Sequence, residues 1–273
     1  MTRAEAFPWG RLALATLGGV LLQGLTAHAF NDWEDWRSGT DCRSPGRLSG
    51  GSRVVPRGLA SREDLLPAGV GALTLAAAVA ALLARETGAL PLLLWALGAW
   101  SAWSYSLPPL RLAYRPLAGE WLAAFPAIAA VAPGVEHLLA GRATAAGWLS
   151  GASHALFCLV WLMQHHLADI AADLSAAPPK RTTPAWLAHR LGLRWARLPG
   201  IVYSCAALLL AAGAARRVSR GFLGSAALAF AGAVVAAGTR PDEEPDIARR
   251  EVILIALTAA NAAVLCLTIL AGG

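Results

Sequence analysis

The sequence predicts an all-α membrane protein, a polytopic bundle of about eight transmembrane helices that forms one domain over residues 1–273. Hydrophobic residues make up 56% of the chain, charged residues make up 15%, and the mean hydropathy is +0.51. These values exceed what a soluble domain needs to fill one core. A bilayer core of about 30 Å requires about 20 apolar residues per helix. Eight windows almost free of charge have about this length: 8–30, 66–84, 89–107, 118–135, 143–165, 197–215, 219–239 and 250–271.

Taken in order, these windows read as helices, and three of them lead into polar segments. The second window contains Leu73–Ala84, a continuous run rich in Ala and Leu, whereas strands of a membrane barrel alternate apolar with polar residues. The first window ends at NDWEDWRSGTD, the third runs into YSLPPLRLAYRPLAGE, and the fifth runs into HHLADIAADLSAAPPKRTT. The last three windows follow one another through short loops. No soluble domain fits between any two windows.

The distribution of basic residues predicts the orientation of the bundle. If the helices alternate in direction, four loops share one side and contain 16 of the 23 Lys and Arg residues, against 7 on the other side: 31–65, 105–118, 165–197 and 238–250. The positive-inside bias places these loops in the cytoplasm and the chain in the inner (plasma) membrane. Arg216, Arg217 and Arg220 run against this assignment. The net charge of +6 is explained by this topology, so no nucleic-acid partner is expected.

The N-terminus also admits a second interpretation, as a secretory signal peptide. Basic residues precede the apolar stretch Leu12–Leu22, and Ala27-His28-Ala29 is similar to a cleavage site. Cleavage would leave seven helices. It would also export the acidic segment that follows, and the later helices would then have to invert or lose one member.

Acidic residues gather in two places that both fall on the side predicted to be cytoplasmic. The segment after the first window holds Asp32, Glu34, Asp35 and Asp41, and the segment after the fifth holds Asp169 and Asp173. On a helix that continues out of the membrane, residues four apart project from the same face. This spacing relates Asn31 to Asp35 and Asp169 to Asp173, so the two pairs can converge at one depth.

Converging carboxylates require a cation between them, because like charges repel. Mg²⁺ suits such a place, since it binds through one or two carboxylates plus substrate phosphates. Lys180, the only lysine, and Arg181 stand beside the second pair, and such groups commonly bind phosphate oxygens. The pattern indicates a magnesium–diphosphate site formed jointly by both segments. The alternative that remains open is ordinary solvated charge in loops.

Three segments carry a resemblance to the UbiA-type intramembrane prenyltransferases, and within them to the dihydroxynaphthoate polyprenyltransferase branch of menaquinone biosynthesis. NDWEDWRSGTD is similar to that branch's first Asp motif and continues into GGSRVVPRGLAS at 50–61. The second segment resembles the family's Tyr-Ser-x-Pro-Pro-x-Arg loop and the Gly-Glu that follows it. The third segment matches the Asp-x-x-x-Asp motif and the basic residues after it. The matching residues are Asn31, Asp32, Asp35, Gly39 and Asp41, then Tyr105, Pro108, Pro109, Arg111 and Glu120, then Asp169, Asp173, Lys180, Arg181 and Thr182.

The resemblance implies a Mg²⁺-dependent enzyme that ionises an allylic prenyl diphosphate and joins the resulting cation to an aromatic acceptor. It implies metal ligands at Asp32, Asp35, Asp41, Asp169 and Asp173, and diphosphate contacts at Asn31, Arg53, Lys180 and Arg181. Tyr105 and Arg111 are the expected catalytic residues. Arg111 is expected at the diphosphate or the acceptor, with a role as a positive-inside anchor as the alternative that stays open. Tyr105, with Trp100 and Trp103, would form an aromatic wall for the cation, although Trp and Tyr also gather at membrane interfaces. No obligate protein partner is predicted.

Three features depart from the family pattern, and two other functions stay open. The first Asp motif follows a single window, so we expect the family's first helix to be absent. His165-His166 stand where the menaquinone branch has Asn, and Pro178-Pro179 stiffen the next segment. The same site could serve a membrane terpene cyclase, which uses no acceptor. Boundary carboxylates could also belong to a secondary transporter, or the chain could be an inactive member of the family.

Overall fold

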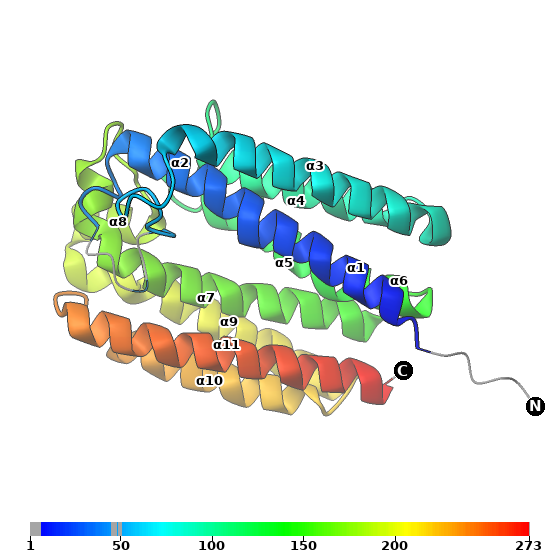
Figure 1. Cartoon of the computed structure of the whole chain (residues 1–273). Helices are drawn as coiled ribbons and strands as arrows, with labels where there is room; N and C mark the ends of the chain where they lie inside the picture. The colour runs from blue at the N-terminus through cyan, green and yellow to red at the C-terminus, as the bar shows by residue number, and fades with distance from the viewer. Residues whose placement is uncertain (1–6, 45–47, 49–50, 273) are drawn as a thin grey trace, which may run out of the picture.

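The computed structural model describes residues 7–44, 48 and 51–272, and these residues form helices and no strand. The predicted all-α bundle is thus confirmed for this part of the chain (Figure 1). The helices in chain order are α1 (Trp9–Gly19), η1 (Val20–Ala27), α2 (His28–Ser38), α3 (Arg62–Thr87), α4 (Leu90–Ser106), η2 (Leu112–Tyr114), η3 (Gly119–Ala124), α5 (Phe125–Ala129), α6 (Val131–Ala140), α7 (Ala145–Ser175), α8 (Thr183–Leu191), η4 (Leu193–Arg197), α9 (Leu198–Arg217), α10 (Phe222–Gly238) and α11 (Glu244–Gly272).

Six helical segments in the described part of the chain are long and apolar enough to cross a membrane. They are Trp9–Ser38, Arg62–Thr87, Gly119–Ala140, Ala145–Ser175, Leu193–Arg217 and Glu244–Ala271. The two other predicted windows also form helices, α4 and α10, but each has 17 residues. At 1.5 Å per residue, such a helix is about 25 Å long. The expectation of about eight spans is therefore confirmed for six. The other two helices, α4 and α10, are shorter than any of these six segments.

Local sequence accounts for several helix ends near the predicted cytoplasmic side. α2 ends at Gly39, which adopts the left-handed conformation with φ +85, where a residue without Cβ is favoured. α3 begins with a capping box, since Ser61 and Asp64 bond each other's backbone. At the far end of the bundle, α7 begins after Thr144, whose hydroxyl accepts a hydrogen bond from the Gly147 amide.

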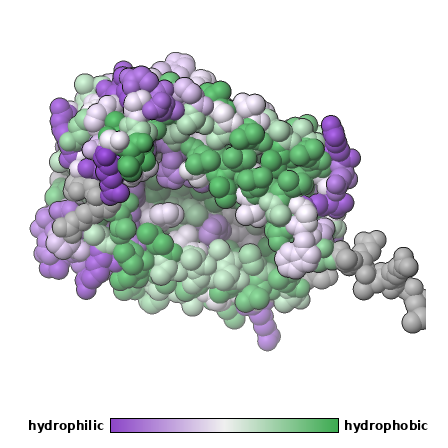
Figure 2. Space-filling view, in the orientation of Figure 1, coloured by the Kyte–Doolittle hydropathy of each residue, from purple (hydrophilic) through white to green (hydrophobic). Residues whose placement is uncertain are grey.

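The bundle has α7 at its centre, with the N-terminal helices on one side and the C-terminal helices on the other (Figure 1). α7 is the most deeply enclosed of the membrane-crossing segments, and it packs against α9 and α11 through a core that includes Leu159, Met163, Tyr203 and Leu254. Hydrophobic residues cover the sides of the bundle, and hydrophilic residues gather at its ends (Figure 2). The connections α2–α3, α4–η3, α7–α8 and α10–α11 all lie at one end of the bundle, on the left of Figure 1.

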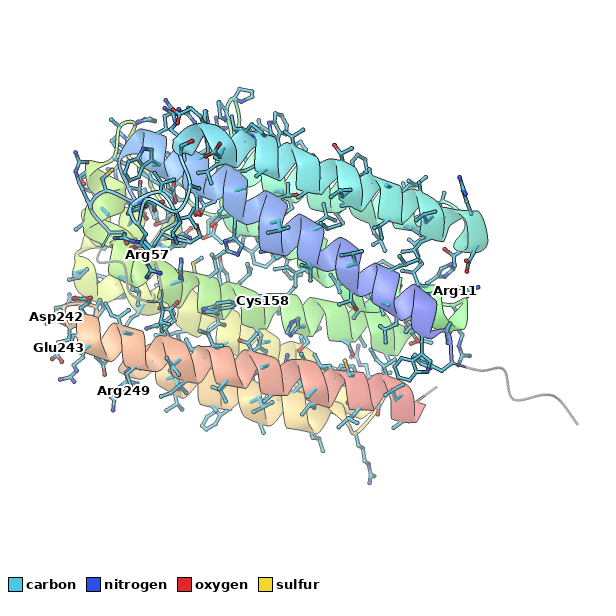
Figure 3. The ribbon with its side chains drawn as sticks, in the orientation of Figure 1. Arg11, Arg57, Cys158, Asp242, Glu243 and Arg249 are labelled. Carbon is cyan, nitrogen blue, oxygen red and sulfur yellow. The ribbon has the colours of Figure 1, made fainter. Side chains whose placement is uncertain are left out.

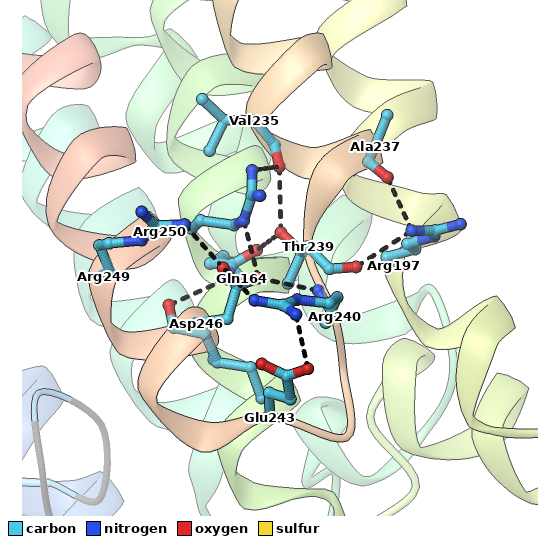
Figure 4. Close-up of polar contacts among 11 residues, drawn as sticks. Gln164, Arg197, Val235, Ala237, Thr239, Arg240, Glu243, Asp246, Arg249 and Arg250 are labelled. Atoms are coloured by element: carbon cyan, nitrogen blue, oxygen red, sulfur yellow. Dashed lines mark hydrogen bonds and ion pairs between the residues drawn. The ribbon is translucent and has the colours of Figure 1, made fainter.

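A polar network fixes the α10–α11 turn at this end of the bundle (Figure 4). The Asp246 carboxylate accepts hydrogen bonds from the Arg240 amide at 3.0 Å, from Arg249 Nη2 at 2.9 Å and from Arg250 Nε at 2.8 Å. Gln164 of α7 bonds both Thr239 and the Ile247 carbonyl, at 3.1 Å each. The network thereby ties α10 and α11 to the central helix.

Replacing Asp246 with Ala is expected to destabilise this end of the bundle. The carboxylate is 2% exposed, and its loss leaves Arg250 Nε and the Arg240 amide without their acceptor, which costs about 2–4 kcal/mol. Thermal unfolding in detergent measures the change. Asp242→Ala is the matched control, because Asp242 points outward from the same turn (Figure 3). Equal melting temperatures for the two variants would show that Asp246 does not stabilise this end of the bundle.

Candidate functional site

The two predicted Asp motifs meet at the end of the bundle where α2 and α7 terminate, and Lys180 lies between them. Its Nζ atom is 2.7 Å from Asp35 Oδ2 and 4.0 Å from Asp173 Oδ1. All three side chains are buried, at 4%, 5% and 0% exposure for Lys180, Asp35 and Asp173. Convergence of the motifs, expected from their spacing alone, is thus present in the fold. A lysine ammonium bridges them.

The loop after α2 encloses the first motif. Ser52 donates hydrogen bonds to the Asp32 carboxylate from both its hydroxyl and its amide. Gly51 has a φ of +70, and a Cβ there would lie 2.5 Å from Asp32 Oδ1 and 3.3 Å from Asp41 Oδ2. Asp32 and Asp41 therefore converge on one backbone position that only glycine can fill.

The second motif is linked to the first loop and to the segment after α7. Ser44 donates a hydrogen bond of 2.6 Å to Asp169 Oδ1, and Thr182 donates one of 3.3 Å to Asp173 Oδ2. The Lys180 amide donates to the Asp173 carbonyl at 2.8 Å. The other carboxylate oxygen, Asp173 Oδ1, is buried and has no hydrogen-bond partner among the residues that the structure describes, which is costly unless a cation approaches it.

The clustered carboxylates strongly shift the titration of groups in the loops. Burial and, after it, the neighbouring carboxylates of Asp35 and Asp32 together raise the pKa of Asp41 to about 8, although Lys180 acts to lower it. Burial alone would lower the pKa of Lys180, but the carboxylates of Asp35 and Asp173 hold it well above its usual value. The site is thus an excess of negative charge around one fixed cation.

These residues fit Mg²⁺ held together with a diphosphate. No group of three or more acidic, His or Cys side chains is already close enough to hold a metal ion within the described ranges, so an all-protein cage is not present there. Mg²⁺ commonly binds through one or two carboxylates and completes its shell with water and phosphate oxygens. Two candidate ligands of that kind are Asp173, whose Oδ1 atom has no hydrogen-bond partner among the described residues, and Asp41, whose pKa is raised.

The raised pKa of Asp41 predicts that Mg²⁺ binding strengthens as pH rises. Below about 8 the carboxyl keeps its proton in the folded protein, and the metal has to displace it. Affinity should therefore increase from about pH 6 to about pH 8 and then level off. Calorimetric titration of the protein with Mg²⁺ alone, repeated across this pH range, measures the affinity. Asp41→Asn should flatten the dependence, and equal wild-type affinities at both ends of the range would contradict the prediction.

Comparison with known proteins decides the family. Residues 1–258 match the model of the UbiA prenyltransferase family. The chain belongs to the UbiA prenyltransferase family. Neither a curated protein nor a solved structure matches it. Membership makes the chain a prenyltransferase with membrane-crossing helices, and indicates a prenyl diphosphate and an aromatic compound as substrates, with Mg²⁺ as the usual cofactor.

The remaining diphosphate-contact candidates of this prenyltransferase lie around the Asp cluster. Asn31 donates to Asp35 Oδ2 at 3.0 Å, and Arg53 Nη1 donates to the Asp41 carbonyl at 3.1 Å. Arg53 also adopts a positive φ of 61, so the loop is held in a conformation that bulky residues rarely adopt. The side chain of Arg181 is exposed. Lys180 is thus the candidate most directly engaged with both motifs.

The two predicted catalytic residues have other partners in this structure. The Tyr105 hydroxyl lies 3.1 Å from His166 Nε2, at the end of α4 beside the cluster. Arg111 Nε lies 2.9 Å from Glu34 Oε1, and Arg37 binds both oxygens of the same carboxylate at 2.7 and 2.9 Å. Glu34 thus neutralises Arg111 on a face of α2 different from the one that carries Asp35, because adjacent helix residues point about 100° apart.

Several residues around the Asp cluster were not singled out from the sequence. They are Ser44, which donates a hydrogen bond to Asp169, Ser52, which donates one to Asp32, and Tyr114. The centre of the Tyr114 ring lies 5.8 Å from Lys180 Nζ. Ser44 and Ser52 flank the first Asp motif, so proximity to that motif is the only signal that could have marked them. The hydroxyl of Tyr114, a partly buried residue, lies 3.5 Å from Asp35 Oδ1, and its burial raises its pKa above the usual value.

Proposed function

We propose that this prenyltransferase moves an isoprenyl group from an allylic prenyl diphosphate to an aromatic quinone precursor, with dihydroxynaphthoate as the preferred acceptor. The site is proposed to face the cytoplasm at the inner (plasma) membrane, within one catalytic domain spanning residues 1–273. The observation that carries the proposal is the position of Lys180 between Asp35 and Asp173. A buried ammonium between two motifs from distant helices suits a diphosphate that both motifs share.

The chain's own residues can hold the diphosphate and stabilise its departure. Bound Mg²⁺ would supply positive charge to the phosphate oxygens, through the Asp motifs. Lys180 can donate to the leaving diphosphate as the bond between the allylic carbon and oxygen breaks, and Arg53 and Arg181 are proposed to assist. Charge that develops on the leaving group is stabilised by these fixed cations, which is commonly the largest single contribution to such catalysis.

The aromatic acceptor is supported by the resemblance of three sequence segments to the menaquinone branch. We propose that the Tyr105 ring, which lies beside the Asp cluster, faces the allylic cation, an interaction that contributes about 0.5–2 kcal/mol. The five carboxylates at Asp32, Asp35, Asp41, Asp169 and Asp173 are the proposed metal ligands, used in part rather than all at once. Arg111 is proposed to contact the acceptor after release from Glu34.

Product analysis separates acceptor transfer from cyclisation at the same site. Purified protein in lipid receives Mg²⁺ and a prenyl diphosphate, with or without dihydroxynaphthoate. The proposal predicts a prenylated naphthol only when the acceptor is present, and prenyl alcohol at most when it is absent. A cyclic hydrocarbon formed without acceptor would instead establish a terpene cyclase. If product forms with another aromatic acceptor but not with dihydroxynaphthoate, the choice of acceptor is wrong, and the proposal of prenyl transfer to an aromatic compound stands.

A further inference from the structure

A buried carboxylate, Glu251, pairs with the partly exposed His165 next to the Asp cluster, and this pair is not used by the chemistry described above. Glu251 of α11 is 2% exposed and lies within a membrane-crossing segment. Its Oε1 atom is 3.0 Å from His165 Nδ1 and 3.4 Å from Trp161 Nε1, both on α7. A carboxylate in such a place is costly unless it is paired, and ionisable groups inside membrane segments commonly mark a functional pathway.

The geometry leaves one nitrogen of His165 available to a ligand. Because Nδ1 faces the Glu251 carboxylate, it carries the ring proton, and Nε2 presents its lone pair. The described residues place no hydrogen-bond partner on Nε2, and 29% of the side chain is exposed. His166 differs: it is 6% exposed and its Nε2 contacts the Tyr105 hydroxyl. His165 is the histidine that a substrate can reach.

The helix geometry places His165 between a surface hollow and the diphosphate site. Seven residues separate it from Cys158 and four from Asp169, so all three share one face of α7. Cys158 lies on α7 between the ribbons of α1 and α11 (Figure 3), where the molecular surface is hollowed (Figure 2). Asp169 is about 6 Å further along the helix axis. An acceptor that enters through the hollow would pass His165 before it meets the diphosphate.

We propose that His165 Nε2 accepts the hydroxyl proton of the aromatic acceptor, and that Glu251 positions the ring and stabilises the imidazolium that results. This step rests on the proposed function. As the O–H bond breaks, its electron pair enters the ring, a ring carbon bonds the allylic carbon, and the allylic C–O bond breaks with its pair leaving on the diphosphate. The ring carbon then loses its hydrogen as a proton to water and aromaticity returns, while His165 gives its proton back to the ring oxygen, so that the product is the neutral hydroxyl compound.

His165→Asn tests the step while retaining a donor toward Glu251, because the Asn amide can replace Nδ1–H. A positioned general base contributes about 100-fold or more to turnover, so kcat should fall by about that factor while the KM for prenyl diphosphate stays unchanged. Turnover by the variant should rise steeply across dihydroxynaphthoate and hydroxybenzoate analogues of increasing hydroxyl acidity, whereas the wild type should respond weakly. His189→Ala, an exposed histidine on α8, is the matched control.

Glu251→Gln tests the positioning role with a readout that a structural role alone would not change. The amide keeps a hydrogen-bonding oxygen but removes the charge that stabilises the imidazolium. We expect about a tenfold loss in kcat and an intermediate response to acceptor acidity, with partial recovery in Glu251→Asp. If His165→Asn folds and matches the wild type in kcat and in its response to acidity, the inference is overturned.

Failure of the inference is distinguishable from failure of the proposed function. A wild-type protein that forms no prenylated product overturns both. If the wild type forms product and the His165→Asn variant is equally active, only the assignment of His165 as the base is overturned. Binding of prenyl diphosphate with Mg²⁺ and without an acceptor, measured by calorimetry, serves as the folding check. The His165 variants should bind it as the wild type does.

Discussion

Replacing Asp173 with Asn is expected to reduce prenyl transfer by about 1,000-fold, the factor that corresponds to a loss of about 4 kcal/mol of transition-state stabilisation. Asp173 is fully buried, and its Oδ1 atom has no hydrogen-bond partner among the described residues. It is therefore the oxygen most available to a metal. Asn keeps the side-chain volume and an oxygen for the Thr182 hydroxyl, so the change removes charge rather than shape.

The matched control for this variant is Asp242→Asn, an exposed carboxylate at the same end of the bundle. Turnover of the control should equal that of the wild type. The measurement is initial rate in lipid with saturating Mg²⁺, alongside thermal unfolding of each protein. An Asp173→Asn protein that remains folded and keeps more than about one tenth of wild-type turnover would exclude Asp173 as a ligand of the diphosphate-bound metal.

Replacing Lys180 with Met is expected to weaken binding of prenyl diphosphate by about 10- to 100-fold, the cost of a charged hydrogen bond. The same change should destabilise the unliganded protein by about 3–5 kcal/mol, because it leaves the carboxylates of Asp35 and Asp173 buried without their shared cation. Added Mg²⁺ should restore much of that stability. The Mg²⁺-induced rise in melting temperature should thus be larger in the variant than in the wild type.

Arg181→Met is the matched control for stability, because the neighbouring Arg181 side chain is exposed. Its melting temperature should stay near that of the wild type. A Lys180→Met protein with wild-type melting temperature and wild-type affinity for prenyl diphosphate would show that the ammonium bridges the motifs without functional consequence.

The fold followed from composition and window length, because apolar runs of about 20 residues have few alternatives to a helix in lipid. Helix length is set by where the chain turns, so α4 and α10 stop at 17 residues although their windows appeared longer. The convergence of the Asp motifs was predictable for a similar reason. Asp35 and Asp173 each lie in the last turn of a helix, at the same end of the bundle, and four-residue spacing fixes the face on which they project.

The partners of individual side chains were not predictable, because they depend on packing between distant helices. Glu251 lies 86 residues from His165 in the chain, and their contact depends on how α11 packs against α7. Likewise, Arg111 was expected at the diphosphate or the acceptor but pairs with Glu34, a residue that the sequence placed only within an acidic segment. Gly51 is a further example, since its role becomes apparent only when Asp32 and Asp41 approach it.

The most direct test of the joint diphosphate site is binding of a non-ionisable prenyl thiodiphosphate in the presence of Mg²⁺. Calorimetry compares the wild type with Asp35→Asn on α2 and Asp173→Asn on α7, each checked for folding by thermal unfolding. We predict Mg²⁺-dependent binding to the wild type and its loss in both variants, because the ligand is held by both motifs together. Wild-type affinity in either folded variant would contradict a site shared between the two helices.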